Sequence, residues 1–175
     1  QDVDNAIKFM RSKSAGWKIS NKKFGLIGGS AGGHLSLLYG HAYDSAAVVK
    51  TIISIAGPTD MTDTIFQHYA ANYGIGYVFE ALLGSTYQDN PQVYRDASPL
   101  YHAGTVPTFF LTGGYDTLVP PWQSYRMFDT LSLHGIVTDT TVFMNADHNI
   151  FGPNGVNQHQ IYDEVMMWLN QHLGN

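Results

Sequence analysis

Hydrophobic residues recur along this chain in two patterns that alternate with each other. Short apolar runs that end on glycine or on polar residues predict strands buried on both faces. Between them lie stretches whose apolar residues recur every three or four positions, and these predict amphipathic helices. The predicted strands are 22–29, 48–58, 106–114 and 138–148, and the predicted helices are 1–15, 32–43, the segment that follows Pro121, and 157–173.

Strands separated by helices are typical of a parallel sheet that is covered on both faces. We therefore predict an α/β fold, a three-layer α/β/α sandwich with a mostly parallel sheet, formed by the 175 residues as a single domain. Residues 61–104 interrupt the alternation, because they are rich in aromatic residues and punctuated by glycine and proline. We interpret them as an excursion with short helices that shapes a pocket.

Composition narrows the classes of partner. The chain has 9 Lys and Arg against 14 Asp and Glu, a formal net charge of −5, and no run of basic residues, so we expect neither nucleic acid nor an anionic membrane surface as a partner. No cysteine is present, which excludes disulfides and thiolate chemistry. No apolar run approaches the ~20 residues of a membrane-spanning helix. The cysteine-free, charge-poor and tyrosine-rich composition favours an extracytoplasmic location.

The most informative stretch is "GLIGGSAGGHLSLLYG", residues 25–40, in which Ser30 stands between Gly28 and Gly32 where a predicted strand meets a predicted helix. This context indicates a nucleophile elbow, a tight turn that lifts a serine hydroxyl above the sheet. We expect both glycines because a side chain at either position would collide with the neighbouring strand or helix. The N–H of Ala31, at the helix N-terminus, would face an oxyanion. A plain glycine-rich turn or a phosphate-binding loop is the alternative, but no Gly-Lys-Ser/Thr sequence follows.

A serine nucleophile needs a base, and the base needs an acid that orients it. In a parallel sheet these partners belong just beyond the carboxyl ends of later strands. Asp116 follows the third predicted strand, and His148 lies in the loop after the fourth. Asp60 also follows a strand and is the rival acid. Asp147 is not expected to orient His148, because neighbouring side chains in an extended segment point apart.

The remaining polar residues suggest less. A metal site formed by Asp60, Asp63 and His68 is an alternative to solvated loop residues, but no recognised ligand spacing occurs, so we expect neither a metal nor another cofactor. Of the other histidines, His34 is expected beneath the serine. Three more, His41, His159 and His172, are expected on helix surfaces. His134 is expected at a helix C-terminus, next to Gly135.

Four segments, in this order, resemble the esterases and lipases of the α/β-hydrolase superfamily: "GLIGGSAGGHLSLL", "IAGPTDM", "NPQVYRDASPLYHAGTVPTFFLTGGYDTLVPPWQSYRMFDTL" and "ADHNIFG". The resemblance is to feruloyl- and acetyl-xylan-esterase-like proteins and to relatives of prolyl oligopeptidase. It implies that Ser30 is the nucleophile, Asp116 the acid and His148 the base.

The resemblance covers only the C-terminal portion of that fold. It implies N-terminal strands and a His-Gly-Gly-type loop, the second oxyanion donor, that this sequence does not contain. Lack of one donor costs an acyl-transfer site about 3–4 kcal/mol. The strand predicted at 22–29 would also form an open, apolar sheet edge. We expect a second copy or an N-terminal partner segment to cover that edge.

These observations predict a serine hydrolase that cleaves small-molecule carboxylic esters through an acyl-enzyme. Aromatic residues of the excursion are the candidates for substrate binding, although they could equally pack it onto the sheet: Tyr69, Tyr73, Tyr77 and Phe79. Two alternatives stay open. One is a peptidase of the prolyl oligopeptidase type, which uses the same three residues, and the other is a non-catalytic hydrolase-like fragment or assembly module.

Overall fold

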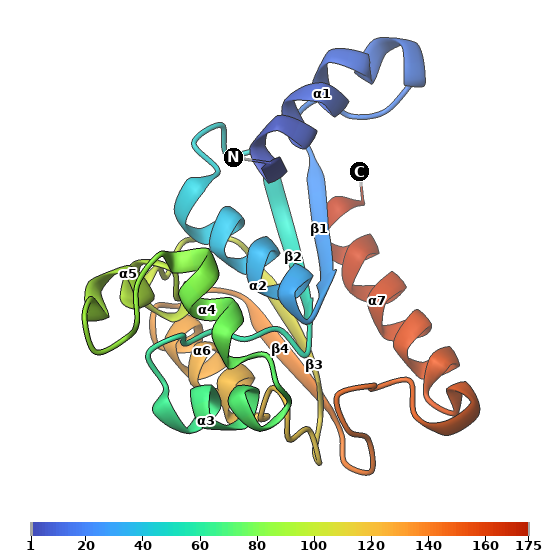
Figure 1. Ribbon diagram of the computed structural model, residues 1–175. Coiled ribbons are helices and arrows are strands. Elements are labelled where there is room, and N and C mark those ends of the chain that lie inside the picture. The colour runs from blue at the N-terminus through green and yellow to red at the C-terminus, as the bar shows by residue number, and fades with distance from the viewer. Residues whose placement is uncertain (1, 175) are drawn as a thin grey trace.

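Four parallel strands form the centre of the molecule (Figure 1). The computed structural model describes residues 2–174. The strands are β1 (Phe24–Gly29), β2 (Val49–Ile55), β3 (Thr108–Gly113) and β4 (Thr138–Phe143), and they lie in the spatial order β1-β2-β3-β4. All three neighbouring pairs are parallel. The predicted α/β fold with a parallel sheet is therefore confirmed.

Helices cover both faces of this sheet (Figure 1). They are α1 (Asp2–Trp17), α2 (Ala31–Leu38), α3 (Thr64–Asn72), α4 (Gly76–Leu83), α5 (Pro91–Asp96), α6 (Trp122–Leu133) and α7 (Gln158–Leu173), with a π-helical turn at Tyr39–Tyr43 and 3₁₀ turns at Pro99–Tyr101 and Pro153–Gly155. Helices α2 and α6 pack on one face and α7 on the other, while α1 projects from the body. Within residues 2–174 no helix is both long and apolar enough to span a bilayer.

The core is divided in two by the sheet. Successive residues of a strand point to opposite faces, so Ile52 and Phe110 pack with α2 and α6, whereas Ile53 and Phe109 pack with α7. Both isoleucines are fully buried. Burial on both sides explains why the central strands are nearly continuous apolar runs in the sequence.

Helix α2 packs through small residues, which the hydrophobic pattern did not reveal. In the apolar pattern of this segment Leu35 shares one helix face with Leu38 and Tyr39, but 51% of its surface is exposed. A Cβ added at Gly40 would come within 2.5 Å of Ile52 Cδ1, so the helix and β2 lie too close together for a larger residue. The buried face of this helix and of the turn that follows it consists of Gly33, Ser36, Leu37, Tyr39 and Gly40.

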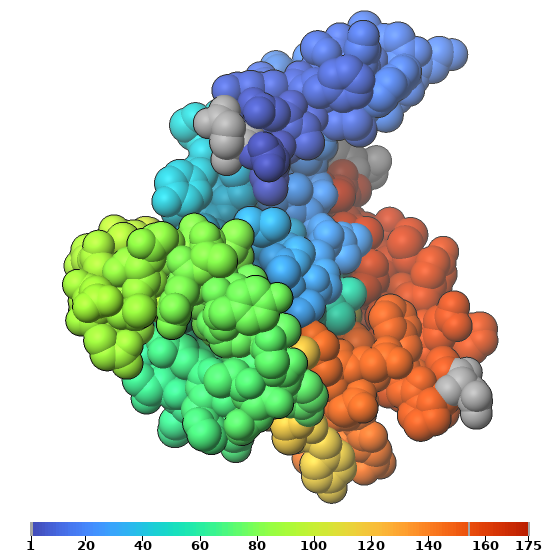
Figure 2. Space-filling view, in the orientation of Figure 1, coloured from blue at the N-terminus to red at the C-terminus, as the bar shows by residue number. Residues whose placement is uncertain are grey.

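The excursion at 61–104 forms a lobe beside α2, the green region of Figure 2. It contains α3, α4, α5 and the 3₁₀ turn. Its own apolar cluster joins Met61, Phe66 and Tyr94 to Val119, which precedes α6. The lobe is thereby fixed to the carboxyl-end side of the sheet, where β3 leads into α6.

Strand β1 is an edge strand. Among the described residues it pairs only with β2, so its other edge has no strand partner. Ile27 in this strand is 49% exposed. The edge position matches the open sheet edge expected for this segment, while its association with a partner stays a prediction.

Candidate active site

Ser30 occupies the tight turn between β1 and α2. Its backbone φ is 51° and its ψ is −120°, a conformation that residues other than glycine rarely adopt. Two hydrogen bonds hold the turn: the Ser30 N–H donates to the Ile55 carbonyl at 2.8 Å, and the Ser30 carbonyl accepts from the His34 N–H at 3.1 Å. Strained backbone of this kind is concentrated at functional sites.

Close backbone packing around the turn requires glycine, but not at both of the expected positions. A Cβ at Gly28 would lie 2.1 Å from the Gly32 carbonyl oxygen. A Cβ at Gly32 would meet nothing within 4 Å, so the collision expected there is wrong. The second close approach occurs at Gly33, whose Cβ would lie 2.9 Å from Ser54 Oγ and 3.0 Å from Gly57 Cα. The second position that requires glycine is therefore determined by the close packing of α2 on the sheet, and not by the turn.

Ser30, His148 and Asp116 form a continuous chain of hydrogen bonds. Nε2 of His148 lies 3.0 Å from Ser30 Oγ, and Nδ1 of His148 lies 2.8 Å from Asp116 Oδ2. A carboxylate can only accept, so Nδ1 carries the ring proton and Nε2 is free to accept from the serine hydroxyl. The Asp116 side chain is fully buried and that of His148 is 28% exposed.

The backbone after β3 fixes the orientation of the Asp116 carboxylate. Its Oδ1 accepts from the N–H groups of Leu118 and Val119, at 2.9 and 2.8 Å. This leaves Oδ2 for His148. A turn closed by its own aspartate thus holds the acid in one rotamer.

The rival carboxylates have other partners. Asp60 forms an ion pair with Arg126 at 2.8 Å and accepts from the N–H and the hydroxyl of Thr62. Asp147 Oδ1 accepts from the Asn149 N–H, as expected for a side chain that points away from its neighbour His148. Asp116 is the carboxylate that contacts the imidazole.

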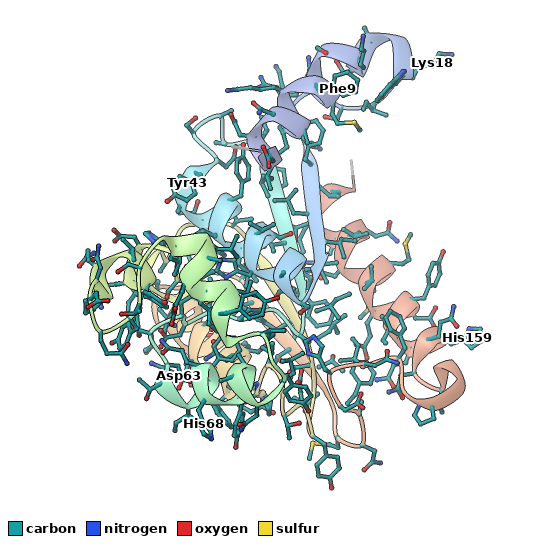
Figure 3. All side chains as sticks on the ribbon, viewed as in Figure 1. Phe9, Lys18, Tyr43, Asp63, His68 and His159 are labelled. Atoms are coloured by element: carbon teal, nitrogen blue, oxygen red, sulfur yellow. The ribbon has the colours of Figure 1, made fainter. Side chains whose placement is uncertain are left out.

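The alternative metal site does not assemble. Asp63 caps α3 and accepts from Trp122 Nε1 at 2.8 Å, and His68, labelled with it in Figure 3, lies further along the same helix. Throughout the described part of the chain, no group of three His, Cys, Asp or Glu residues could hold a metal ion.

An apolar cavity of about 180 Å³ opens beside Ser30. Ser30, Ala31 and His34 contribute its floor from the start of α2. The surrounding walls come from the loop after β2, the excursion and the segment before α6: Pro58, Met61, Phe66, Ile75, Val78, Phe79, Leu82, Leu83, Ala97, Leu118 and Val119. Ala31 is the first residue of α2, where backbone N–H groups have no partner within the helix.

Of the four aromatic residues considered for substrate binding, the structure brings Phe79 to this cavity. The other three do not line it: Tyr69, Tyr73 and Tyr77. The hydroxyl of Tyr73 instead hydrogen-bonds to Thr117 Oγ1 at 2.6 Å, and Tyr77 is 70% exposed. Residues two apart on a helix face different sides, which explains why Tyr77 and Phe79 differ.

Two histidines lie in places that the sequence did not indicate. His41 was expected on a helix surface, but its Nε2 lies 3.0 Å from Thr108 Oγ1 and its Nδ1 accepts from the Gly104 N–H. Burial lowers the pKa of His41 to about 4. His172 is partly buried against Trp168, and burial lowers its pKa too. His159 is exposed on α7, as expected (Figure 3).

Comparisons with known proteins agree with this architecture. A model of the BD-FAE family matches residues 1–131. The esterase LipQ of Mycobacterium tuberculosis is 28% identical over 166 residues, which is 86% of this chain and 38% of LipQ. The structure of a puromycin-hydrolyzing peptidase from M. tuberculosis is 26% identical with a TM-score of 0.83, and the match covers 99% of this chain and 25% of that one.

The structure of an acylaminoacyl peptidase in complex with Z-Gly-Gly-Phe-chloromethyl ketone has a TM-score of 0.82 at 21% identity, and the match covers 100% of this chain and 27% of that one. This likeness supports the fold. The chain spans less than two fifths of LipQ and about a quarter of each of the two solved structures. With the family model matching most of its length, the chain belongs to the BD-FAE family and has the α/β-hydrolase fold.

Proposed function

We propose that the chain carries the reactive residues of a serine hydrolase that cleaves carboxylic esters. The observation that carries this proposal is the hydrogen-bonded chain from Ser30 through His148 to Asp116, with distances of 3.0 and 2.8 Å. A serine hydroxyl becomes nucleophilic only when such a base is within reach and is itself oriented. The esterase LipQ among the relatives favours an ester as the substrate.

In the proposed mechanism Nε2 of His148 takes the hydroxyl proton as Ser30 Oγ attacks the ester carbonyl carbon. The negative charge that develops on the carbonyl oxygen is stabilised by the Ala31 N–H. The C–O bond to the alcohol then breaks, and His148 returns the proton to the departing alcohol. Water, deprotonated by His148, then attacks the acyl-enzyme. The bond between the acyl carbon and Ser30 Oγ breaks, His148 returns the proton to Ser30, and the acid leaves. Asp116 stabilises the imidazole whenever it is protonated.

The environment of Ser30 supports a substrate with an apolar portion. The cavity beside it is lined almost entirely by apolar side chains, among them Phe79. Phe79 is therefore our proposed substrate-binding residue. Tyr69 and Tyr73, which contact Trp122 and Thr117, would hold the lobe, whereas Tyr77 is exposed. Ala31 supplies one oxyanion donor. Catalysis with this donor alone is expected to be slower by about a hundred- to a thousandfold than with two.

A second candidate is hydrolysis of amides, because the same three side chains serve peptidases. The puromycin-hydrolyzing peptidase among the similar structures favours it. Matched substrates separate the two: p-nitrophenyl acetate offers an ester, and acetyl-p-nitroanilide offers an amide of the same acyl group. Faster turnover of the anilide would favour the peptidase.

A fluorophosphonate probe tests the reactive serine directly. We expect the folded protein to be labelled on the peptide that contains Ser30, as identified by mass spectrometry. Labelling should disappear in Ser30→Ala. It should persist in Ser36→Ala, which removes a different hydroxyl of α2, one that donates to the Gly32 carbonyl. Unlabelled Ser30 in folded protein would reject the hydrolase and favour the non-catalytic module.

A further inference from the structure

Among the described residues that line the cavity beside Ser30, His34 is the one titratable side chain, and it has no part in the proposed mechanism. It lies in the first turn of α2, four residues after Ser30, and both residues line the cavity. Apart from these two residues, the cavity lining is apolar. Polar side-chain recognition within this cavity must therefore come from Ser30 or His34.

The hydrogen bond that His34 makes determines its chemical character. Nδ1 lies 3.2 Å from the carbonyl oxygen of Pro58. A carbonyl only accepts, so Nδ1 must carry a proton. Burial lowers the pKa of His34, although its bond to Pro58 opposes the change, and the neutral ring is favoured. In a neutral ring with a proton on Nδ1, Nε2 is a hydrogen-bond acceptor.

The ring is also held in place. The two residues that follow Pro58, Thr59 and Asp60, both donate their N–H groups to Oε1 of the buried Gln123, at 2.9 and 2.8 Å. These bonds fix the carbonyl that receives the His34 proton. The imidazole is therefore anchored through a rigid segment and does not swing freely.

Nε2 of His34 has no hydrogen-bond partner among the residues that the structure describes, and it is not fully buried. A ligand without a donor that shields this acceptor from solvent leaves it unpaired and costs free energy, whereas a ligand that offers a donor avoids that cost. A ligand that offers a donor here gains an advantage over one of equal shape without a donor.

We propose that the cavity beside Ser30 receives an apolar part of the substrate that bears a hydroxyl group, and that Nε2 of His34 accepts the hydrogen bond from this hydroxyl. His34 is then a specificity-determining residue. This inference rests on the proposed function only in taking Ser30 as the reacting residue. The cavity volume of about 180 Å³ suits a substrate portion the size of one ring, since an apolar cavity of about 150 Å³ takes up benzene.

Phenol and toluene test the proposal, because they have nearly the same shape and only phenol can donate. Their dissociation constants would be measured by ¹H–¹⁵N NMR titration on the full chain and on His34→Phe, which keeps a ring but removes the acceptor. We expect the ratio of the toluene constant to the phenol constant to be about tenfold larger with His34 than with Phe, as for one neutral hydrogen bond. Comparing ratios cancels the difference in the hydration of the two probes.

Two further variants serve as controls. His34→Asn retains a donor toward Pro58 but places no acceptor at the Nε2 position, so it should give the same lowered ratio as His34→Phe. It takes the place of His34→Phe if that variant folds poorly. Ser30→Ala should keep the wild-type ratio, because the serine is not the acceptor. A loss of the ratio in Ser30→Ala with no loss in His34→Phe would overturn the assignment.

The ring itself provides an independent readout in the unmodified chain. Long-range ¹H–¹⁵N spectra should show Nδ1 of His34 protonated, and the Nε2 resonance should move when phenol is added but not when toluene is added. A proton on Nε2 in the free protein, or equal ratios in the parent and the two His34 variants, would refute the proposal. Binding of phenol and toluene needs no turnover. Failure of Ser30 to react with a fluorophosphonate would therefore refute the proposed hydrolase but would not decide whether His34 binds the hydroxyl group.

Discussion

Oγ of Ser30 lies 3.0 Å from Nε2 of His148, although the two residues follow strands at opposite edges of the described sheet. Three inter-strand spacings separate β1 from β4, about 14 Å. The loop after β4 must therefore reach back across the carboxyl ends of β3 and β2. Gly113, at the end of β3, permits this passage, because a Cβ there would lie 2.1 Å from the Asp147 carbonyl oxygen.

Gly113→Ala should for that reason displace the loop that carries His148. A misplacement of about 1 Å costs a catalytic site roughly a hundredfold in rate. We expect fluorophosphonate labelling of Ser30 to slow by at least about tenfold while the far-ultraviolet circular dichroism stays native. The control is Gly16→Ala, at a glycine whose Cβ would meet nothing within 4 Å. Equal labelling rates in the two variants would contradict this role of Gly113.

Asp116→Asn should abolish reactivity without unfolding the protein. The asparagine oxygen can still accept from Leu118 and Val119, which preserves the turn. Its NH₂ group would then face Nδ1 of His148 and favour the tautomer that places the ring proton on Nε2, toward Ser30. A loss of about 10⁴-fold in kcat is the expectation for such a change.

The neighbouring carboxylate supplies the control for that measurement. Asp147→Asn alters a side chain that bonds only to the Asn149 N–H in the described structure, so the rate of p-nitrophenyl acetate hydrolysis should stay within about twofold of the parent. If Asp147→Asn were the damaging change, the assignment of the acid would fall.

Gly28→Ala and Gly32→Ala should differ sharply, although both replace a glycine two positions from Ser30. The first puts a methyl group 2.1 Å from the Gly32 carbonyl oxygen, and overpacking of this kind costs about 1–3 kcal/mol or more. The second meets open space within α2, where alanine is favoured over glycine by up to about 1 kcal/mol. Urea denaturation measures both, and equal free energies of unfolding would disprove the packing argument.

His41 should make the protein less stable in mild acid. Burial lowers its pKa from 6.5 to about 4, so between these values the unfolded chain binds a proton that the folded chain does not. The free energy of unfolding should thus fall as the pH decreases from 7 to 5, by on the order of 1–2 kcal/mol from this residue. His41→Gln, which can still donate to Thr108, should lose that part of the pH dependence in urea denaturation. An unchanged dependence of the unfolding free energy on pH in His41→Gln would contradict this role of His41.

The open edge of β1 should promote association. Ile27 is 49% exposed on a strand whose outer edge has no strand partner among the described residues. Unprotected edges pair with other chains, and a lysine on such an edge opposes pairing. Ile27→Lys should shift sedimentation velocity profiles toward the monomer, whereas Leu133→Lys, at an exposed position on α6, should not. A parent protein that is monodisperse and monomeric would contradict the prediction.

The sequence predicted best where local pattern and chemistry coincide. Ser30, Asp116 and His148 each follow an apolar run at a point where the chain turns, and topology alone brings the ends of parallel strands to one side. Position along the chain was therefore sufficient to place all three on that side of the sheet, whereas the contact between His148 and Ser30 depends on the loop after β4.

Tertiary packing decided the rest. The inner face of α2 is formed largely by small residues, which a search for large apolar side chains overlooks, and Leu35 is exposed. His41 is buried because it packs against residues distant in the sequence, Gly104 and Thr108. In the excursion, the rotation of α4 about its own axis determines that Phe79 and not Tyr77 lines the cavity, and no local signal sets that rotation.

The hydrogen-bonded residues and the cavity wall come from different parts of the chain, and this affects how selectivity can change. The three hydrogen-bonded residues lie at strand ends and in their turns, whereas most of the cavity wall belongs to the lobe at 61–104. Grafting a different lobe between β2 and β3 would alter which molecules fit without moving a donor or an acceptor of the reactive chain. Under the proposed function, reactivity and choice of substrate are encoded in separable stretches of one polypeptide.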